Sequence, residues 1–166
     1  MSHLFLVGFM GSGKSTVGRL LASDLELPFV DLDRQIEADA GQSITDIFAR
    51  RGEPAFRAME HDALEGLTDE PDHVVACGGG VVVDDRNRVL LKALGRVVYL
   101  RITAEEAIAR IGSTEGRPLL AGGDPVAAGR TLLASRENLY SAVADVIIDT
   151  SGQTPHQVAE SVEAAL

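Results

Sequence analysis

The sequence predicts an α/β protein in which a five-stranded parallel sheet lies between two layers of helices. Five short apolar runs alternate along the chain with segments whose apolar residues recur at helical spacing. Most of these runs are continuously apolar, as are strands that helices cover on both faces. At 166 residues and 45% hydrophobic content the chain can bury one sizeable core, so a single domain over residues 1–166 is expected.

Each apolar run is expected to form one strand. Strands that alternate with helices imply right-handed crossovers, which give a parallel sheet with helices on both faces. Ligands of such folds bind beyond the carboxyl ends of the strands. The predicted strands are residues 3–7, 28–32, 73–77, 96–101 and 145–149.

The helices are predicted from apolar stripes and from residues typical of helix ends. Ser43 is the expected N-cap of one helix, with Asp46 three residues on, and Gly52 ends that helix. Later helices are expected to start at Asp124 and Pro125, running toward Tyr140, and at Thr154 and Pro155. The apolar stripes are Val17, Leu20, Leu21 and Leu25; Ile44, Ile47 and Phe48; and Phe56, Met59, Ala63, Leu64 and Leu67.

The segment 112–125 is predicted to be a mobile surface loop. Its sequence, GSTEGRPLLAGGDP, contains four Gly and two Pro around a single arginine and is too punctuated for a helix.

Composition narrows the class of protein. The net charge of −10 and the pI near 4.8 argue against non-specific binding to nucleic acid or to anionic lipid. Cys77 is the sole cysteine, so no intrachain disulfide can form. The first apolar run ends at Gly8 and has no charged leader, so neither a signal peptide nor a membrane span is expected. We therefore expect a soluble, cytoplasmic protein.

A phosphate-binding loop follows the first predicted strand. Residues 8–15 fit the pattern G-x-x-x-x-G-K-[ST], between a strand and a helix as the mechanism requires. The glycines let backbone N–H groups point inward, and the helix start adds partial positive charge. Lys14 can reach the β and γ phosphates, and the hydroxyl of Ser15 can bind Mg²⁺. Nucleotide binding is predicted.

Two acids at the end of the second predicted strand supply candidate catalytic carboxylates. No N-K-x-D pattern surrounds Lys14 or Lys92, which argues against a guanine switch. In FVDLDRQIE, strand alternation places Asp31 and Asp33 on the same side, where one can bind a metal through water and the other can face a hydroxyl. The alternative is that one of them, Asp33, only caps the helix containing Ile36.

Three further features have two interpretations each. Arg57 is followed three residues later by Glu60, either as an oriented binding group or as a solvated pair. The run Gly78 to Gly80 after a buried strand is either a ligand-approaching loop or a tight turn. Arg136, at the border of an apolar stripe, either extends to water or points into an anionic pocket.

Arg117, in the predicted loop, is the fourth such feature. An arginine on a mobile segment suits a lid that closes and neutralises charge on a transferred phosphoryl group. A plain solvated arginine is the alternative.

Together these residues resemble the shikimate kinases, small P-loop enzymes related in fold to the nucleoside monophosphate kinases. The resemblance covers essentially the whole chain through GFMGSGKST, DLD, FR followed by Glu60, GGG, RPLL and SRENLY, in that order. It implies a P-loop NTPase fold, a substrate-binding segment at about 32–60 and a lid at about 112–124. It also implies transfer of the ATP γ-phosphoryl group to the 3-hydroxyl of shikimate, in aromatic amino-acid biosynthesis, by a protein expected to be a monomer.

The resemblance implies a role for each candidate residue. Asp33 would contact the shikimate hydroxyls and orient or deprotonate the attacking oxygen, and Arg57 and Arg136 would clamp the carboxylate. The implied sets are Asp33, Lys14 and Arg117 for catalysis; Asp33, Arg57, Gly78, Gly79, Gly80 and Arg136 for shikimate; Gly11, Ser12, Gly13, Lys14, Ser15, Thr16, Arg110, Arg117 and Pro155 for ATP; and Ser15 with Asp31, the latter through water, for Mg²⁺.

Two positions differ from the family pattern, and two rival functions are considered. Glu115 puts a negative charge near Arg117, and Gln153 lies near the expected adenine turn, where some relatives carry Arg. The rivals are another small-metabolite kinase, such as a gluconate kinase, and a nucleotide-sensing module without catalysis. The paired arginines favour a carboxylate substrate, and Asp33 with Arg117 favours catalysis.

Overall fold

The computed structural model describes residues 2–113 and 117–166, and these contain one five-stranded sheet in which all the paired strands are parallel. The strand order is β2-β3-β1-β4-β5, which confirms the predicted fold class. β1 lies in the centre and is buried along its whole length, as the apolar run from Leu4 to Val7 requires. The strands are β1 (His3–Val7), β2 (Phe29–Asp31), β3 (Val74–Ala76), β4 (Gly95–Arg101) and β5 (Val146–Asp149).

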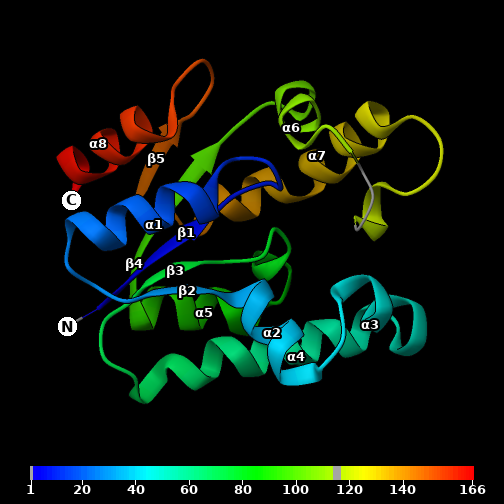
Figure 1. The fold of residues 1–166 in the computed structure, drawn as a ribbon, viewed down its shortest axis with the longest axis horizontal. Helices are drawn as coiled ribbons and strands as arrows, with labels where there is room; N and C mark the ends of the chain where they lie inside the picture. Colours follow the sequence, from blue (N-terminus) through cyan, green and yellow to red (C-terminus); the bar gives the residue numbers. More distant parts are fainter. Residues whose placement is uncertain (1, 114–116) are drawn as a thin grey trace.

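Helices cover both faces of the sheet (Figure 1). α1 and α8 pack together on one face, and α4, α5 and α7 lie on the other. α2 and α3 pack on α4 beyond the sheet, and α6 packs on α7. The helices are α1 (Lys14–Asp24), α2 (Leu32–Ala40), α3 (Ile44–Arg51), α4 (Glu53–Glu65), α5 (Asp85–Leu94), α6 (Ala104–Ile111), α7 (Pro125–Val143) and α8 (Pro155–Ala165), with 3₁₀ turns η1 (Gly66–Asp69), η2 (Val81–Val83) and η3 (Pro118–Leu120).

Alternation along β1 divides the core into two clusters. Phe5 and Val7 face the α4, α5 and α7 side, whereas Leu4 and Leu6 face α1 and α8. A third, smaller cluster of Ile36, Ile47 and Phe56 joins α2, α3 and α4. This third cluster fixes the helices that face the loops at the carboxyl end of the sheet.

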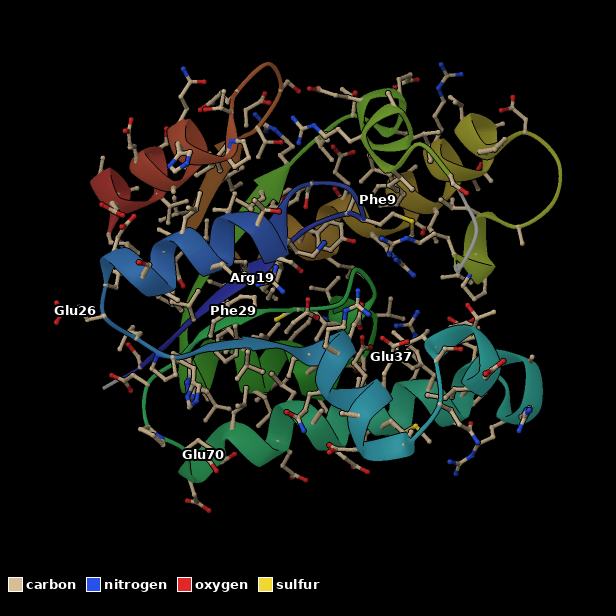
Figure 2. The ribbon with its side chains drawn as sticks, in the orientation of Figure 1. Phe9, Arg19, Glu26, Phe29, Glu37 and Glu70 are labelled. Atoms are coloured by element: carbon tan, nitrogen blue, oxygen red, sulfur yellow. The ribbon has the colours of Figure 1, made fainter. Side chains whose placement is uncertain are left out.

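The edge strand β2 is attached to α1 by Phe29 (Figure 2). The guanidinium of Arg19 lies 5.0 Å from the centroid of the Phe29 ring, and the ring covers Gly18. A Cβ at position 18 would lie 2.6 Å from Cε2 of this ring, so a larger residue would displace β2. This packing sets the position of Asp31, the last residue of β2.

Three predicted helix starts and one predicted helix end are confirmed. The Ser43 hydroxyl accepts from the backbone N–H of Asp46 at 3.1 Å, and Gly52 ends α3. Thr154 and Gln157 form a reciprocal capping box at the start of α8, and Asp124 caps α7. Two helices, α5 and α6, were not predicted.

Two residues assigned to apolar stripes lie outside their helices. α1 ends at Asp24, so Leu25 is exposed beyond it, and Leu67 lies in η1 after α4.

Among the described helices, none is long and apolar enough to span a membrane.

Candidate active site

The two glycine-rich loops lie next to each other because their strands are neighbours. β1 pairs with β3, with Leu6 beside Ala76, and the phosphate-binding loop follows β1 while the Gly78 to Gly80 run follows β3. In a parallel sheet both loops therefore leave from the same edge. The sequence places these loops 70 residues apart, and the strand order brings them together.

The phosphate-binding loop needs glycine for both backbone shape and space. Gly8, Gly11 and Gly13 all have positive φ, at 148°, 78° and 92°. A Cβ on Gly8 would lie 2.4 Å from the carbonyl oxygen of Leu100, and one on Gly11 would lie 2.8 Å from that of Ala107. No side chain caps α1 at Gly13, so the N-terminus of this helix is open to an anion.

Lys14 folds back over this loop. Its Nζ donates to the carbonyl oxygens of Gly8 at 2.7 Å and Phe9 at 2.9 Å. Burial lowers the pKa of Lys14 to about 8, against the opposing effect of Asp33. A nucleotide phosphate would supply the negative charge that this ammonium group lacks.

Asp31 and Asp33 do not lie on one strand, which corrects the alternation argument. β2 ends at Asp31 and the chain is already helical at Leu32. Asp31 is the N-cap of α2, accepting from the N–H groups of Asp33 at 3.1 Å and Arg34 at 3.3 Å. The alternative prediction, that Asp33 caps this helix, is also wrong, because Asp33 lies in the first turn of α2.

The second oxygen of Asp31 faces the phosphate-binding loop. Its Oδ2 accepts a hydrogen bond from the hydroxyl of Ser15 at 2.7 Å. A hydroxyl and a carboxylate are the oxygen ligands that Mg²⁺ prefers, so these two side chains fit a magnesium site. The described residues contain no cluster of three or more His, Cys, Asp and Glu side chains that could hold a metal without help, so phosphate or water oxygens would complete such a site.

Asp33 is a buried carboxylate with one oxygen lacking a partner. Its Oδ1 is buried and makes no hydrogen bond within the described part of the chain. Burial, then the charge of Asp31, raises the pKa of Asp33, while Lys14 and Arg117 lower it. An unpaired buried oxygen is costly, which is typical of a group that awaits a ligand.

Arg57 is held between two glutamates on α4. Its Nη1 donates to Glu60 at 3.0 Å, and its Nη2 donates to Glu53 at 3.2 Å. Glu60 is only 1% exposed, so the pair is not the solvated surface pair of the alternative interpretation. Burial raises the pKa of Glu60 to about 7, although Arg57 opposes the shift, and its Oε2 is left without a partner in the described residues.

The glycine run gives these charged groups their space. A Cβ on Gly78 would lie 2.6 Å from Oδ1 of Asp33 and 2.9 Å from Oε2 of Glu60. A Cβ on Gly80 would lie 2.1 Å from Nη1 of Arg57. The run is therefore required by the close approach of two acids and an arginine, a reason that the sequence did not reveal.

Arg136 is buried on α7 and does not extend to water. It is 3% exposed, and its Nη1 would lie 3.5 Å from a Cβ on Gly79. Arg57 and Arg136 line one small cavity of about 90 Å³ together with Asp33 and the glycine run. Phe48 and Phe56 add apolar surface to this cavity.

Two larger cavities adjoin the small one through shared residues. A cavity of about 550 Å³ is lined by the phosphate-binding loop, Asp31 and Asp33, and Glu37 of α2 also lines it (Figure 2). A cavity of about 440 Å³ lies between Arg110 and Pro155 over the outer side of the loop. Among the described residues, Arg117 is the one that lines all three cavities.

The described part of the predicted lid covers the small cavity. Arg117 is exposed, while Pro118 and Leu119 of η3 line the cavity and Leu120 is buried. Glu115 lies outside the described residues. The mobility of this segment stays a prediction.

The outer cavity contains the residues expected at the adenine end. Arg110 donates to the carbonyl oxygen of Thr150 at 2.9 Å and to Glu106 at 3.0 Å, which attaches α6 to the turn before α8. Gln153 and Pro155 line this cavity, as do Ser12 of the phosphate-binding loop and Thr16 of α1.

Comparison with known proteins identifies the family. The shikimate kinase family model matches residues 10–166. A shikimate kinase from Pseudomonas savastanoi pv. phaseolicola is 45% identical over 166 residues, which is 100% of this chain and 96% of that protein. One from Rhodococcus jostii is 43% identical over 161 residues, 97% of this chain and 95% of that protein.

The chain belongs to the shikimate kinase family. It is therefore a kinase, a phosphotransferase acting on shikimate, and use of ATP follows from this membership. The structure of a shikimate kinase from Acinetobacter baumannii in complex with shikimate has a TM-score of 0.95 and 39% identity, covering 98% of this chain and 91% of that one. A gluconokinase from Sinorhizobium meliloti, at a TM-score of 0.66 and 19% identity over 99% of this chain and 90% of that one, shares only the fold.

Sequence reasoning did not find several residues of this shikimate kinase site. Glu53 accepts a hydrogen bond from Arg57, and Tyr140 donates one to the glycine run. Phe48 and Met10 line the small cavity. In the sequence Glu53, Phe48 and Tyr140 have only the signal of helix surface or apolar stripe, and Met10 occupies an unspecified position of the phosphate-binding loop pattern. The helical spacing of four between Arg136 and Tyr140 is the one cue that could have joined them.

Proposed function

We propose that this shikimate kinase transfers the γ-phosphoryl group of ATP to the 3-hydroxyl of shikimate within a single domain, residues 1–166, using Mg²⁺. The observation that carries this proposal is the small cavity itself. Arg57, Arg136 and Asp33, from three different helices, line it beside the phosphate-binding loop, and Glu60 and Arg117 line it as well. A substrate with a carboxylate and hydroxyl groups on one ring matches these side chains, because the arginines can bind the carboxylate and Asp33 can contact the hydroxyl groups.

Shikimate would bind with its carboxylate between Arg57 and Arg136. Arg57 is already oriented by Glu60 at 3.0 Å, so little side-chain freedom is lost when the substrate arrives. The N–H groups of Gly78, Gly79 and Gly80 would approach the ring, and Phe48 and Phe56 would cover its apolar edges. The hydroxyl groups would then face Asp33.

Asp33 would orient the attacking hydroxyl and accept its proton. Its Oδ1 is buried without a partner, and its pKa is raised, both of which suit a group that takes a proton from a bound hydroxyl. In-line transfer through a loose transition state depends mainly on such positioning and on neutralisation of charge.

The nucleotide would occupy the two larger cavities. Its phosphates would bind the backbone of residues 11–16, including Ser12 and Thr16, with Lys14 beside them. The adenine would lie between Arg110 and Pro155. Mg²⁺ would be held by the Ser15 hydroxyl and, through water, by Asp31, and would neutralise phosphate charge.

The segment 112–124 would act as the lid. Arg117 lines the cavities on both sides of the transfer path, so its guanidinium can reach the group in transit. Arginines in this role contribute on the order of 10³- to 10⁵-fold in rate. Closure would also exclude water, which otherwise competes as acceptor.

The deciding experiment is an acceptor panel. The protein is incubated with ATP, Mg²⁺ and a set of hydroxy acids that includes shikimate and gluconate, and ADP release is measured in a coupled assay. Turnover with shikimate is expected. Turnover with gluconate instead, or ATP binding without ADP release for any acceptor, would favour one of the two rival functions.

A variant tests the role of Asp33 separately. Asp33→Asn keeps the shape of the side chain but cannot accept the proton, so kcat should fall by at least about 100-fold while the Kd for ATP changes little. Unchanged kcat would remove Asp33 from the mechanism.

We further propose that the protein is a cytoplasmic monomer. Gel filtration of the purified chain measures its oligomeric state.

A further inference from the structure

We propose that Tyr140 is a positioning residue that holds the substrate-side glycine loop in its binding shape. Tyr140 lies on α7, one helical turn after Arg136, and it is completely buried. Its hydroxyl donates to the carbonyl oxygen of Gly79 at 2.5 Å. Because this inference concerns a residue that orients groups assigned to shikimate, it rests on the proposed function.

The other carbonyls of the loop are held from nearby in the chain. The oxygens of Gly78 and Gly80 accept from the N–H groups of Val81 at 3.1 Å and Val83 at 3.0 Å. Gly79 lies between them, and its carbonyl is held by a side chain 61 residues away in the sequence. The hydroxyl of Tyr140 is thus the contact through which α7 fixes the middle of the loop.

A fixed carbonyl also fixes an N–H group. The peptide between Gly79 and Gly80 is planar and trans, so its N–H points opposite to its C=O. With the Gly79 oxygen turned toward Tyr140, the Gly80 N–H is directed away from α7. Within residues 2–113 and 117–166, neither Gly79 nor Gly80 has a backbone acceptor for its N–H, so these donors remain for a ligand.

The same hydroxyl is coupled to the carboxylate clamp. Burial raises the pKa of Tyr140 to about 12, although the nearby charge of Arg136 lowers it. Tyr140 therefore stays a neutral O–H donor at physiological pH. The Tyr140 hydroxyl and the Arg136 guanidinium, from successive turns of α7, thus both approach Gly79 of the run after β3.

The matched control is the other tyrosine. Tyr99 and Tyr140 are the two tyrosines of the chain, and their ring centroids are 5.0 Å apart. The Tyr99 hydroxyl is buried and has no hydrogen-bond partner among the described residues. Tyr99→Phe and Tyr140→Phe therefore each remove one buried hydroxyl from the same pair of contacting rings, but only the second removes a contact to the loop.

The test is a steady-state comparison of the two variants. Tyr140→Phe should raise the KM for shikimate by about 5- to 20-fold, the effect of losing a hydrogen bond and leaving a buried carbonyl unpaired, with the KM for ATP within twofold. Tyr99→Phe should leave both KM values within twofold. A shikimate KM within twofold of wild type in Tyr140→Phe, or an equal rise for ATP, overturns the proposal.

A spectroscopic measurement does not depend on the folding of Tyr140→Phe. The chain contains no tryptophan, so in the Tyr99→Phe protein Tyr140 is the sole tyrosine chromophore. Saturating shikimate should perturb its near-ultraviolet absorption, and ATP alone should not. No difference spectrum with shikimate overturns the proposal. Wild-type protein that fails to turn over shikimate refutes the proposed function instead, which separates the two failures.

Discussion

Gly80→Ala is expected to disable shikimate binding while leaving the fold and ATP binding intact. A Cβ at position 80 would lie 2.1 Å from Nη1 of Arg57 and 2.5 Å from its Cζ and Nη2. These atoms are the far end of a flexible side chain, so the guanidinium can move where backbone could not. The substitution therefore displaces Arg57 and not the loop.

The size of the effect follows from that displacement. Ordinary contact requires about 3.4 Å or more, so the guanidinium must move by more than about 1 Å. The hydrogen bond to Glu60, at 3.0 Å, cannot be kept over such a shift. A hydrogen bond to a charged group contributes about 1.5 to 3 kcal/mol, and a carboxylate clamp with one arm misplaced should lose a similar amount. At about 1.4 kcal/mol per tenfold, kcat/KM for shikimate should fall by about 10- to 100-fold.

The assay measures kcat/KM for each substrate with the other saturating. The value for ATP should stay within twofold, and the thermal midpoint should move by only a few degrees. Gly66→Ala is the control, since a Cβ there meets nothing within 4 Å and the residue has a helical φ of −58°. Unchanged kcat/KM for shikimate in Gly80→Ala would refute the assignment of Arg57 to the carboxylate.

Two other predictions concern the acids of the site. Asp31→Asn should keep α2 capped, because asparagine caps helices as well as aspartate does. It should nevertheless raise the Mg²⁺ concentration needed for half-maximal activity by about tenfold. A parallel loss of thermal stability would show that the residue is only a cap. Burial raises the pKa of Glu60 from its ordinary 4.5 to about 7. Between these two pH values Glu60 keeps its proton in the folded protein, whereas the unfolded chain has released it. The free energy of unfolding should therefore fall as pH rises from about 4.5 to 7, by on the order of 3 kcal/mol. Urea titrations at pH 5 and pH 8 measure this fall, and Glu60→Gln should remove it. An equal fall in the free energy of unfolding in both proteins would contradict the buried-acid assignment.

Much of the fold could be read from local patterns. The strands are continuous apolar runs, and the caps at Ser43, Asp124 and Thr154 are short-range signals that need no tertiary information. α5 and α6 were not found, although both have N-caps, Asp84 and Thr103, that accept from the backbone. Their apolar stripes are short, so periodicity alone did not separate them from loop.

The site was predictable where one stretch of chain carries the chemistry. The phosphate-binding loop does so, because its glycines, Lys14 and Ser15 are contiguous and the strand and helix around them are local. The predicted arrangement of Asp31 and Asp33 was wrong. Residues two apart on a strand point to the same side, but here α2 begins at Leu32, between the two acids, so that rule does not apply.

By itself the sequence determined the fold class, the nucleotide loop and the set of charged residues that accompany it. The tertiary structure decided which of those charges meet. Glu60 is buried with the run after β3 against it, and Gly78 is required because two carboxylates approach it. Tyr140 reaches Gly79 because α7 packs against η2, which directly follows that run. Such contacts join residues dozens of positions apart, and their free energies depend on desolvation, which only the packed chain creates.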